Sequence, residues 1–341
     1  MLLRNKILLS IILIIVVLTS CGIITYFSLT VPKDTKNTGY YLFCYFLGNS
    51  PEEERVCFAT SNNGYTFDPV GDNIPIITQK LGTGCCRDPY IFRANGKYYI
   101  IATDMKSDLG WNSNYSMVMW ESTDLIKWEN ERIIDIKQKP GFEHTCRTWA
   151  PQVIYDKEVG KYMVYWSHCL DTDWKTYMVY AYLNDDFTDV GEITTLYQPS
   201  SGKDAIDGDI IYENDTYYLY YKDEEKSTIC YVYSDKLTGP FIEPQRNKVS
   251  TSLKEVEGCC TYKLEGTDTY IMIMDEFKDH KYYMQATTKD SMTKFKHVRG
   301  NGAISWFKPR HGSILTITED EYTKLKQLDH QLTFVFPKLY Y

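Results

Sequence analysis

Five residues recur at similar places in successive segments of the chain, and three of them are acids. The first is Asp88, in the stretch Cys-Cys-Arg-Asp-Pro, and the others are Trp149, Asp207, Glu257 and His311. An Asp before a Pro starts many ordinary turns, which is the alternative for Asp88. Two carboxylates on either side of a sugar ring can instead carry glycoside hydrolysis, one as a base that activates water and one as an acid that protonates the leaving oxygen. Whether Asp88 is a turn residue or a catalytic carboxylate depends on the elements that position these five residues.

Four segments share one order of features: a short apolar strand, a turn, an aromatic strand, another strand and a bend rich in Ser and Thr. They begin at Asp88, Trp149, Asp207 and Glu257, and such a period of roughly 50 to 60 residues is typical of a repeat architecture. Each unit holds about four short strands, which is one propeller blade.

The two ends of the chain supply a further blade. The stretch RHGSILTIT near the C-terminus is a first strand with no hairpin after it, and residues 39–67 are a hairpin with no first strand before it. Joined, they close the ring and remove open sheet edges. We therefore predict an all-β fold, a five-bladed β-propeller over residues 39–341, whose ring is closed by N-terminal strands that complete the last blade. The best helix candidate is TEDEYTKLKQL.

A propeller brings the recurring residues together, because its innermost strands surround the central channel and begin at one mouth. Converging acids must repel each other or hold a proton, a cost usually tolerated for function. A third acid near a proton donor raises the pKa of the donor through like-charge repulsion. A Trp at the mouth can stack on the C–H face of a sugar.

The motifs RDPYIF, WAPQVIYD, DAIDGDII, VEGCCTYKL and PRHGSILTITEDEY occur in this order and resemble glycoside hydrolase family 43, most of all its α-L-arabinofuranosidase-like members. The likeness covers residues 40 to 325, nearly everything outside the N-terminal segment. It implies an inverting hydrolase of arabinose- or xylose-containing polysaccharides, first an α-L-arabinofuranosidase and next a β-xylosidase. Carried onto this chain, it makes Asp88 the general base and Glu257 the general acid. Asp207 would tune the pKa of the acid and orient the substrate.

The resemblance also implies residues that bind the sugar. Trp149 would line the pocket, and His311 would lie on the axis near a bound water or cation. Arg310 is a further candidate, because it directly precedes His311 and could reach a sugar hydroxyl. No cofactor is required and no metal site is assigned. A non-catalytic carbohydrate-binding propeller remains the alternative function, and the WAP and HGS motifs argue against a related propeller enzyme acting on fructans.

The cysteines depart from the family pattern. A Cys follows the Glu-Gly pair of the acid motif, where the family usually has Pro, and five cysteines lie near the expected mouth in sequence: Cys85, Cys86, Cys146, Cys259 and Cys260. In an oxidising compartment some should pair, so we expect at least one disulfide, with partners that the sequence does not assign. Buried free thiols are the alternative.

The N-terminus predicts export. No residue between Lys6 and Lys33 is charged, which is long enough for a span of roughly 20 residues. Cations before the apolar run place the N-terminus in the cytosol. We expect a cytosolic stub and signal anchor over residues 1–32, a linker over 33–38, and a membrane-anchored domain outside the cytosol. A lipoprotein modified at Cys21 and a cleaved signal peptide are alternatives.

The composition limits the partners. The net charge is −8 with no basic block, which excludes an electrostatic footprint for nucleic acid. Aromatic residues make up 15% of the chain, a composition that suits pleated sheets. We expect a monomer that binds an oligo- or polysaccharide and meets the membrane only through its N-terminal segment.

Overall fold

The computed structural model describes residues 29–30, 39–249, 253–299 and 304–335. The expected signal anchor, the linker and Cys21 lie almost entirely outside these residues, so the predictions about them stay predictions. Among the helices that the structure describes, none is long and apolar enough to cross a bilayer.

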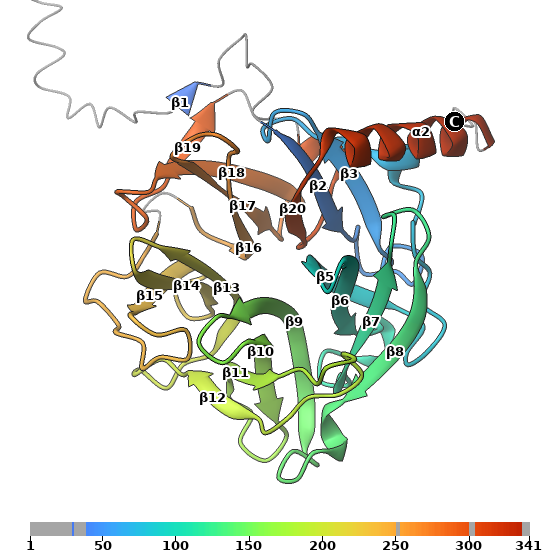
Figure 1. Ribbon diagram of the computed structural model, residues 1–341. Helices are drawn as coiled ribbons and strands as arrows, with labels where there is room; N and C mark the ends of the chain where they lie inside the picture. Colours follow the sequence, from blue (N-terminus) through green and yellow to red (C-terminus); the bar gives the residue numbers. More distant parts are fainter. Residues whose placement is uncertain (1–28, 31–38, 250–252, 300–303, 336–341) are drawn as a thin grey trace, which may run out of the picture.

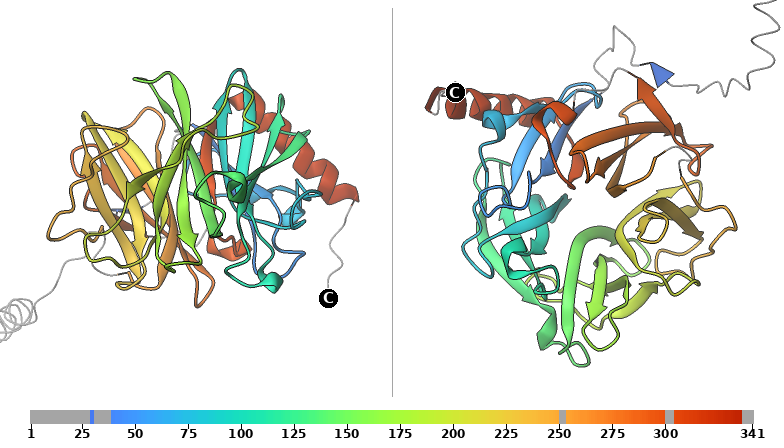
Figure 2. Two further views of the ribbon diagram at one scale, coloured as in Figure 1. Left: turned by 90° about the horizontal axis from the view of Figure 1, so that it is seen from below. Right: turned by 180° about the vertical axis from the view of Figure 1, so that it is seen from behind.

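Five sheets surround a central axis (Figure 1), which confirms the all-β propeller predicted from the repeat. Seen from below, the sheets stand side by side, and seen from behind they again form a ring (Figure 2). Short 3-10 turns lie between strands: η1 (Val70–Asn73), η2 (Ser107–Leu109), η3 (Ile136–Gln138) and η4 (Ser305–Phe307).

Four of the sheets follow one another along the chain. The first two are β5 (Cys86–Ala94), β6 (Lys97–Asp104), β7 (Ser116–Ser122) and β8 (Glu129–Asp135), then β9 (Thr145–Asp156), β10 (Lys161–Leu170), β11 (Thr176–Tyr182) and β12 (Thr194–Tyr197). The next two are β13 (Ala205–Glu213), β14 (Thr216–Asp223) and β15 (Thr228–Ser234), then β16 (Val256–Lys263), β17 (Thr269–Glu276), β18 (Lys281–Thr288) and β19 (Lys296–Arg299) with β1 (Leu29–Thr30).

The fifth sheet joins the two ends of the chain. Its strands, in order, are β20 (Ser313–Ile317), β2 (Tyr40–Tyr45), β3 (Cys57–Ser61) and β4 (Asp68–Pro69). β20 and β2 are antiparallel, with Tyr40 opposite Ile317 and Cys44 opposite Ser313. The last strand of the propeller therefore pairs with the first hairpin.

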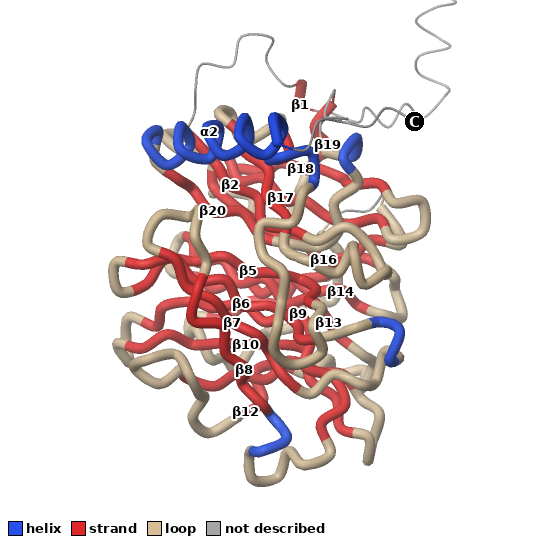
Figure 3. Tube along the Cα trace, turned by 90° about the vertical axis from the view of Figure 1, so that its right-hand side faces the viewer, coloured by secondary structure: helices blue, strands red, loops and turns tan. Residues whose placement is uncertain are grey.

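The helix α2 (Glu319–Val335) follows β20 and lies along the outside of this blade (Figure 3). Its start is a capping box, in which the Glu321 amide donates to Thr318 Oγ1 and the Thr318 amide donates to Glu321 Oε2. Leu325 is buried against the apolar residues of the blade, and Asp329 Oδ1 accepts a hydrogen bond from the Gly71 amide. The predicted helix is confirmed and extends beyond TEDEYTKLKQL.

The blades pack face to face, so both faces of the middle strands are buried. In β2 every residue from Tyr41 to Tyr45 is fully buried, and β17 is buried from Tyr270 to Glu276. Strands buried on both sides read as continuous apolar runs rather than as alternating patterns. This packing explains why aromatic strands recur through the sequence.

Four inner strands carry a β-bulge at equivalent places, and the bulged residue has a left-handed backbone. These residues are Asp88 (φ 51), Ala150 (φ 48), Asp207 (φ 56) and Gly258 (φ 58). A bulge re-aims side chains at the rim of a sheet. The predicted alignment of the repeats was therefore wrong by one residue in two blades. Asp88 and Asp207 are the bulged residues of their strands, whereas Trp149 and Glu257 come directly before the bulged residues of theirs.

Candidate active site

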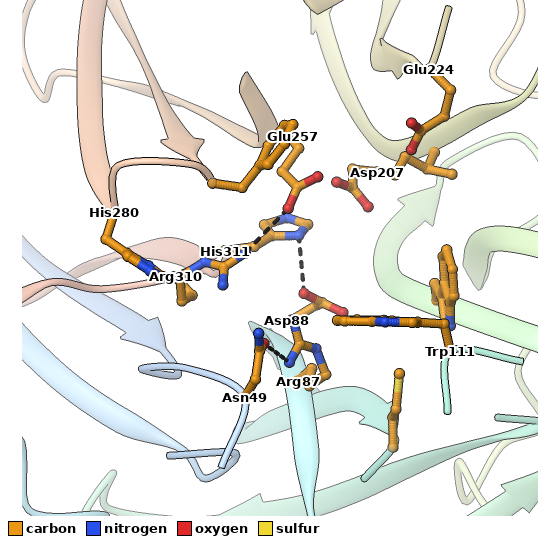
Figure 4. A pocket seen from close by; sticks show the side chains of 14 residues that line it. Asn49, Arg87, Asp88, Trp111, Asp207, Glu224, Glu257, His280, Arg310 and His311 are labelled. Atoms are coloured by element: carbon orange, nitrogen blue, oxygen red, sulfur yellow. Dashed lines mark hydrogen bonds and ion pairs between the residues drawn. The ribbon is translucent and has the colours of Figure 1, made fainter. Parts of the chain in front are cut away.

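A cavity of about 380 Å³ opens at the propeller axis, and all six residues that the sequence singled out line it: Asp88, Trp149, Asp207, Glu257, Arg310 and His311. Figure 4 shows the three carboxylates and the ring of His311 turned toward the same space. The residues come from all four sequential blades and from the segment that leads into β20. The predicted convergence is therefore observed, despite the shift in phase.

Asp88 occupies the bulge of β5. Its Oδ2 accepts a hydrogen bond from Thr103 Oγ1 (3.0 Å), and its Oδ1 lies 3.4 Å from His311 Nδ1. Burial works to raise the pKa of Asp88, but the hydrogen bond and charge of His311, with the charge of Arg87, outweigh burial and hold this pKa below its usual range. Asp88 is therefore ionised at neutral pH, the state that a general base requires.

His311 is the cation beside Asp88. Burial opposes its charge, but the hydrogen bond with Asp88 and the charge of Asp207 prevail and raise the pKa of His311 to about 9. The axis thus carries an imidazolium near neutral pH. In the part of the chain that the structure describes, no cluster of three His, Cys, Asp or Glu side chains is arranged to hold a metal ion.

Asp207 links two blades. Its amide donates to Ser167 Oγ (2.9 Å), and its Oδ2 accepts a hydrogen bond from the Gly258 amide (3.0 Å). Burial raises the pKa of Asp207 to about 7; the charge of His311 opposes this rise, and the charge of Glu257 adds to it. The pKa of Asp207 is therefore shifted in the opposite direction to the pKa of Asp88.

Glu257 lies between two cations. Its Oε2 accepts a hydrogen bond from Lys222 Nζ (2.7 Å) and its Oε1 from Arg310 Nη2 (3.2 Å). Arg310 is held from behind, because its Nε bonds Asp275 and its amide donates to the Phe46 carbonyl (2.7 Å). The carboxylate of Glu257 is thereby fixed at the cavity wall with its side chain 21% exposed.

Comparison with known proteins agrees with this geometry. Residues 37–323 match the sequence profile of a family related to glycosyl hydrolase family 43 and described as "Probable glycosyl hydrolase domain". The chain belongs to this family. The match covers nearly the whole propeller, and it confirms the resemblance read from the motifs.

Individual relatives of this glycosyl hydrolase domain are distant. An α-L-arabinofuranosidase of Bifidobacterium longum subsp. longum is 30% identical over 139 residues, which are 37% of this chain and 13% of that protein. A mutant GH43 protein from Bacillus licheniformis aligns with 81% of this chain and 54% of its own, at a TM-score of 0.55 and 14% identity. A Cellvibrio cellulosa α-L-arabinanase complexed with arabinohexaose aligns with 74% of this chain and 89% of its own, at a TM-score of 0.54 and 18% identity. At these identities the solved structures show the shared fold alone.

Trp149 of the hydrolase domain is packed by a cation. The Arg147 guanidinium lies 4.7 Å from the centroid of its ring. Arg147 is fixed in turn by Asn112 Oδ1 and Thr176 Oγ1, each at 2.8 Å. Arg147, and with it the Trp149 ring, is therefore held by Asn112 from the loop between η2 and β7 and by Thr176, the first residue of β11.

Sequence reasoning missed several cavity residues of the hydrolase domain. They include Asn49, Arg87, Trp111, Glu224 and His280. The Arg87 guanidinium lies 4.5 Å from the ring centroid of Phe46 and 5.1 Å from that of Trp111. Its Nη1 donates a hydrogen bond to Asn49 Oδ1 at 2.8 Å (Figure 4). The sequence did offer a signal for Arg87. It directly precedes the bulged residue of its strand, as Trp149 and Glu257 do in theirs.

The expected disulfide is absent from the residues that the structure describes. All nine of their cysteines are buried free thiols, including the five near the mouth in sequence. Cys86 and Cys259 are typical: burial raises the pKa of each thiol well above its usual range. These cysteines act as small apolar core residues, so the alternative reading was the correct one.

Proposed function

We propose that this protein is an inverting glycosidase of arabinose- or xylose-containing glycans, with α-L-arabinofuranosides as the first candidate substrates and β-xylosides as the second. The observation that carries the proposal is the meeting of Asp88, Asp207 and Glu257 in one axial cavity, where the pKa of Asp88 is held below its usual range and the pKa of Asp207 is raised to about 7. Catalytic acid–base pairs are found where the protein environment gives neighbouring titratable groups different pKa values. A binding module has no need of that separation.

In the proposed reaction, Asp88 takes a proton from water while the water oxygen forms a bond to the anomeric carbon. The bond from that carbon to the glycosidic oxygen breaks, and Glu257 gives its proton to this oxygen. The free sugar leaves with inverted configuration, and solvent returns the proton from Asp88 to Glu257. Asp207 tunes the acid through its like charge and its bond to the Gly258 amide.

Other features support the substrate class and the setting of the reaction. The B. longum relative is named an α-L-arabinofuranosidase, which supports arabinofuranosides as the first candidates to test. Trp149 offers an aromatic surface for the sugar, and Arg310 and His311 border the cavity. The apolar run before Lys33 favours export with a membrane anchor, so the glycan would be met outside the cytosol.

The test uses residues from 37 onward, with aryl α-L-arabinofuranoside and aryl β-D-xyloside as substrates and NMR to follow the anomer released. We expect inverted sugar from the native protein and none from Glu257→Gln or Asp88→Asn. Glu121→Gln is the matched control, because Glu121 pairs with Lys97 away from the cavity. A native protein that binds these sugars and cleaves neither would favour the carbohydrate-binding propeller instead.

A further inference from the structure

Lys222 is a buried cation at the end of a Tyr-rich strand. It is the last residue but one of β14, lies opposite Ile206 in β13, and is only 4% exposed. Its Nζ lies 2.7 Å from Glu257 Oε2 and 3.2 Å from Glu224 Oε1, and 4.5 Å from the ring centroid of Phe277. A buried ammonium is tolerated only where it is paired in this way.

The two contacts of Glu257 are unequal. Lys222 makes the shorter bond, to Oε2, and Arg310 makes the longer one, at 3.2 Å to Oε1. Arg310 also shares its charge with Asp275, whereas Lys222 shares its charge with the cavity residue Glu224. Charge-assisted bonds shorten as they strengthen, so Oε2 is the oxygen more firmly held as an acceptor.

We propose that Lys222 is a positioning residue for the general acid: it holds Glu257 Oε2 as an acceptor, so that Oε1 carries and delivers the proton. The inference rests on the proposed hydrolysis. As Glu257 loses its proton to the glycosidic oxygen, negative charge appears on its carboxylate, and the Lys222 ammonium is already in place to stabilise it. Such preorganised charge acts most strongly in the transition state.

The proposal predicts a dependence on the leaving group. A dinitrophenyl glycoside leaves without protonation, whereas an alkyl glycoside requires the acid. With Lys222→Met, we expect kcat/KM to fall by at least about tenfold on the alkyl glycoside and by less than about threefold on the dinitrophenyl glycoside of the same sugar. Equal losses on both substrates would overturn the proposal, because a merely structural defect lowers both alike.

Three further variants separate the possible causes. Lys226→Met is the matched control, since Lys226 pairs with Asp223 outside the cavity, and it should leave both rates unchanged. Lys222→Arg keeps the cation, so its ratio of kcat/KM on the alkyl glycoside to kcat/KM on the dinitrophenyl glycoside should equal that of the native protein. This variant still tests the proposal if Lys222→Met fails to fold. A ratio in Lys222→Arg that falls as far as in Glu257→Gln counts against the proposal. Glu257→Gln should show the same selective loss on the alkyl glycoside. If Glu257→Gln shows no selective loss, Glu257 is not the acid. If Glu257→Gln shows the selective loss and Lys222→Met does not, only the role proposed for Lys222 is wrong.

Discussion

The Gly258 amide donates a hydrogen bond to Asp207 Oδ2 at 3.0 Å, and this bond ties the third blade to the fourth beside Glu257. Gly258 has a φ of 58, and a Cβ there would lie 2.5 Å from the ring of His311. Only glycine therefore lets the backbone approach both Asp207 and His311. Asp207, which occupies the same bulge position as Asp88, thereby bonds the backbone next to the proposed proton donor Glu257.

Asp207→Asn should change how stability depends on pH. The pKa of Asp207 is raised to about 7 by burial, so the folded protein binds a proton that the unfolded chain has lost. This contribution is fully present below the unfolded value and is lost as pH rises toward 7, a change on the order of 4 kcal/mol at most. We expect the free energy of unfolding of the native protein to fall between pH 4 and 7, and to fall less steeply in Asp207→Asn. Urea unfolding at several pH values measures it.

The slope should not vanish in this variant. Burial also raises the pKa of Asp209 to about 7, and His311, with a pKa of about 9, adds a further loss of stability between its unfolded value and pH 9. Asp209→Asn should reduce the slope in a similar way, since Asp209 is also buried and its Oδ2 accepts a hydrogen bond from the Thr261 amide. Slopes identical in the native protein and both variants would contradict the assigned shifts.

His311→Asn should move the acidic limb of the pH–rate profile. The hydrogen bond and charge of His311 hold the pKa of Asp88 down against burial, and the base must be ionised to act. Without His311, burial raises this pKa, so activity is lost at a higher pH as the solution is acidified. The profile of kcat/KM against pH reports the free enzyme. An unmoved acidic limb would mean that Asp88 is not the base or that His311 does not control it.

Arg147→Met should weaken substrate binding more than catalysis. Arg147 packs on the Trp149 ring and joins it to Asn112 and Thr176, so its loss frees the indole without touching the three acids. We expect KM to rise by a few-fold, in line with the roughly 0.5–1 kcal/mol of a partly exposed cation–π contact. The kcat should change little. A large fall in kcat with constant KM would place Arg147 in the chemical step instead.

Gly312→Ala should destabilise the fold. A Cβ at Gly312 would lie 2.0 Å from the Cys44 carbonyl oxygen and 2.8 Å from the Tyr45 Cα, both backbone atoms of the paired strand β2. Overpacking of this kind costs about 1–3 kcal/mol or more, and thermal unfolding should show a clear fall in Tm. Gly191→Ala is the control, because its Cβ would meet only the Tyr182 carbonyl oxygen at an ordinary 3.6 Å. A Tm equal to that of the control would contradict the predicted clash.

The sequence predicted the blades well because each is a local unit with its own turns. The repeat alone placed Asp88 and Asp207 in matching positions. It misplaced Trp149 and Glu257 by one residue, since the bulge shows in the sequence only where a Gly occupies it, as Gly258 does. At Ala150 nothing in the residue type indicates a left-handed backbone.

Contacts between blades were beyond sequence reasoning. Lys222 is the last residue but one of an aromatic strand, but its partner Glu257 comes from the next blade. The expected disulfide was wrong for a different reason: an oxidising compartment predicts pairing, whereas the cysteines near the mouth are buried as free thiols.

The pairing of β2 with β20 has a consequence for how the protein is made. The hairpin of β2 and β3 is synthesised long before its partner strand, Ser313–Ile317, because the four sequential blades lie between them in the chain. Throughout translation this buried, aromatic hairpin carries an unpaired edge, the kind of surface that recruits other chains. A chain that stops before Ser313 would therefore leave this edge of β2 unpaired and the ring of blades open.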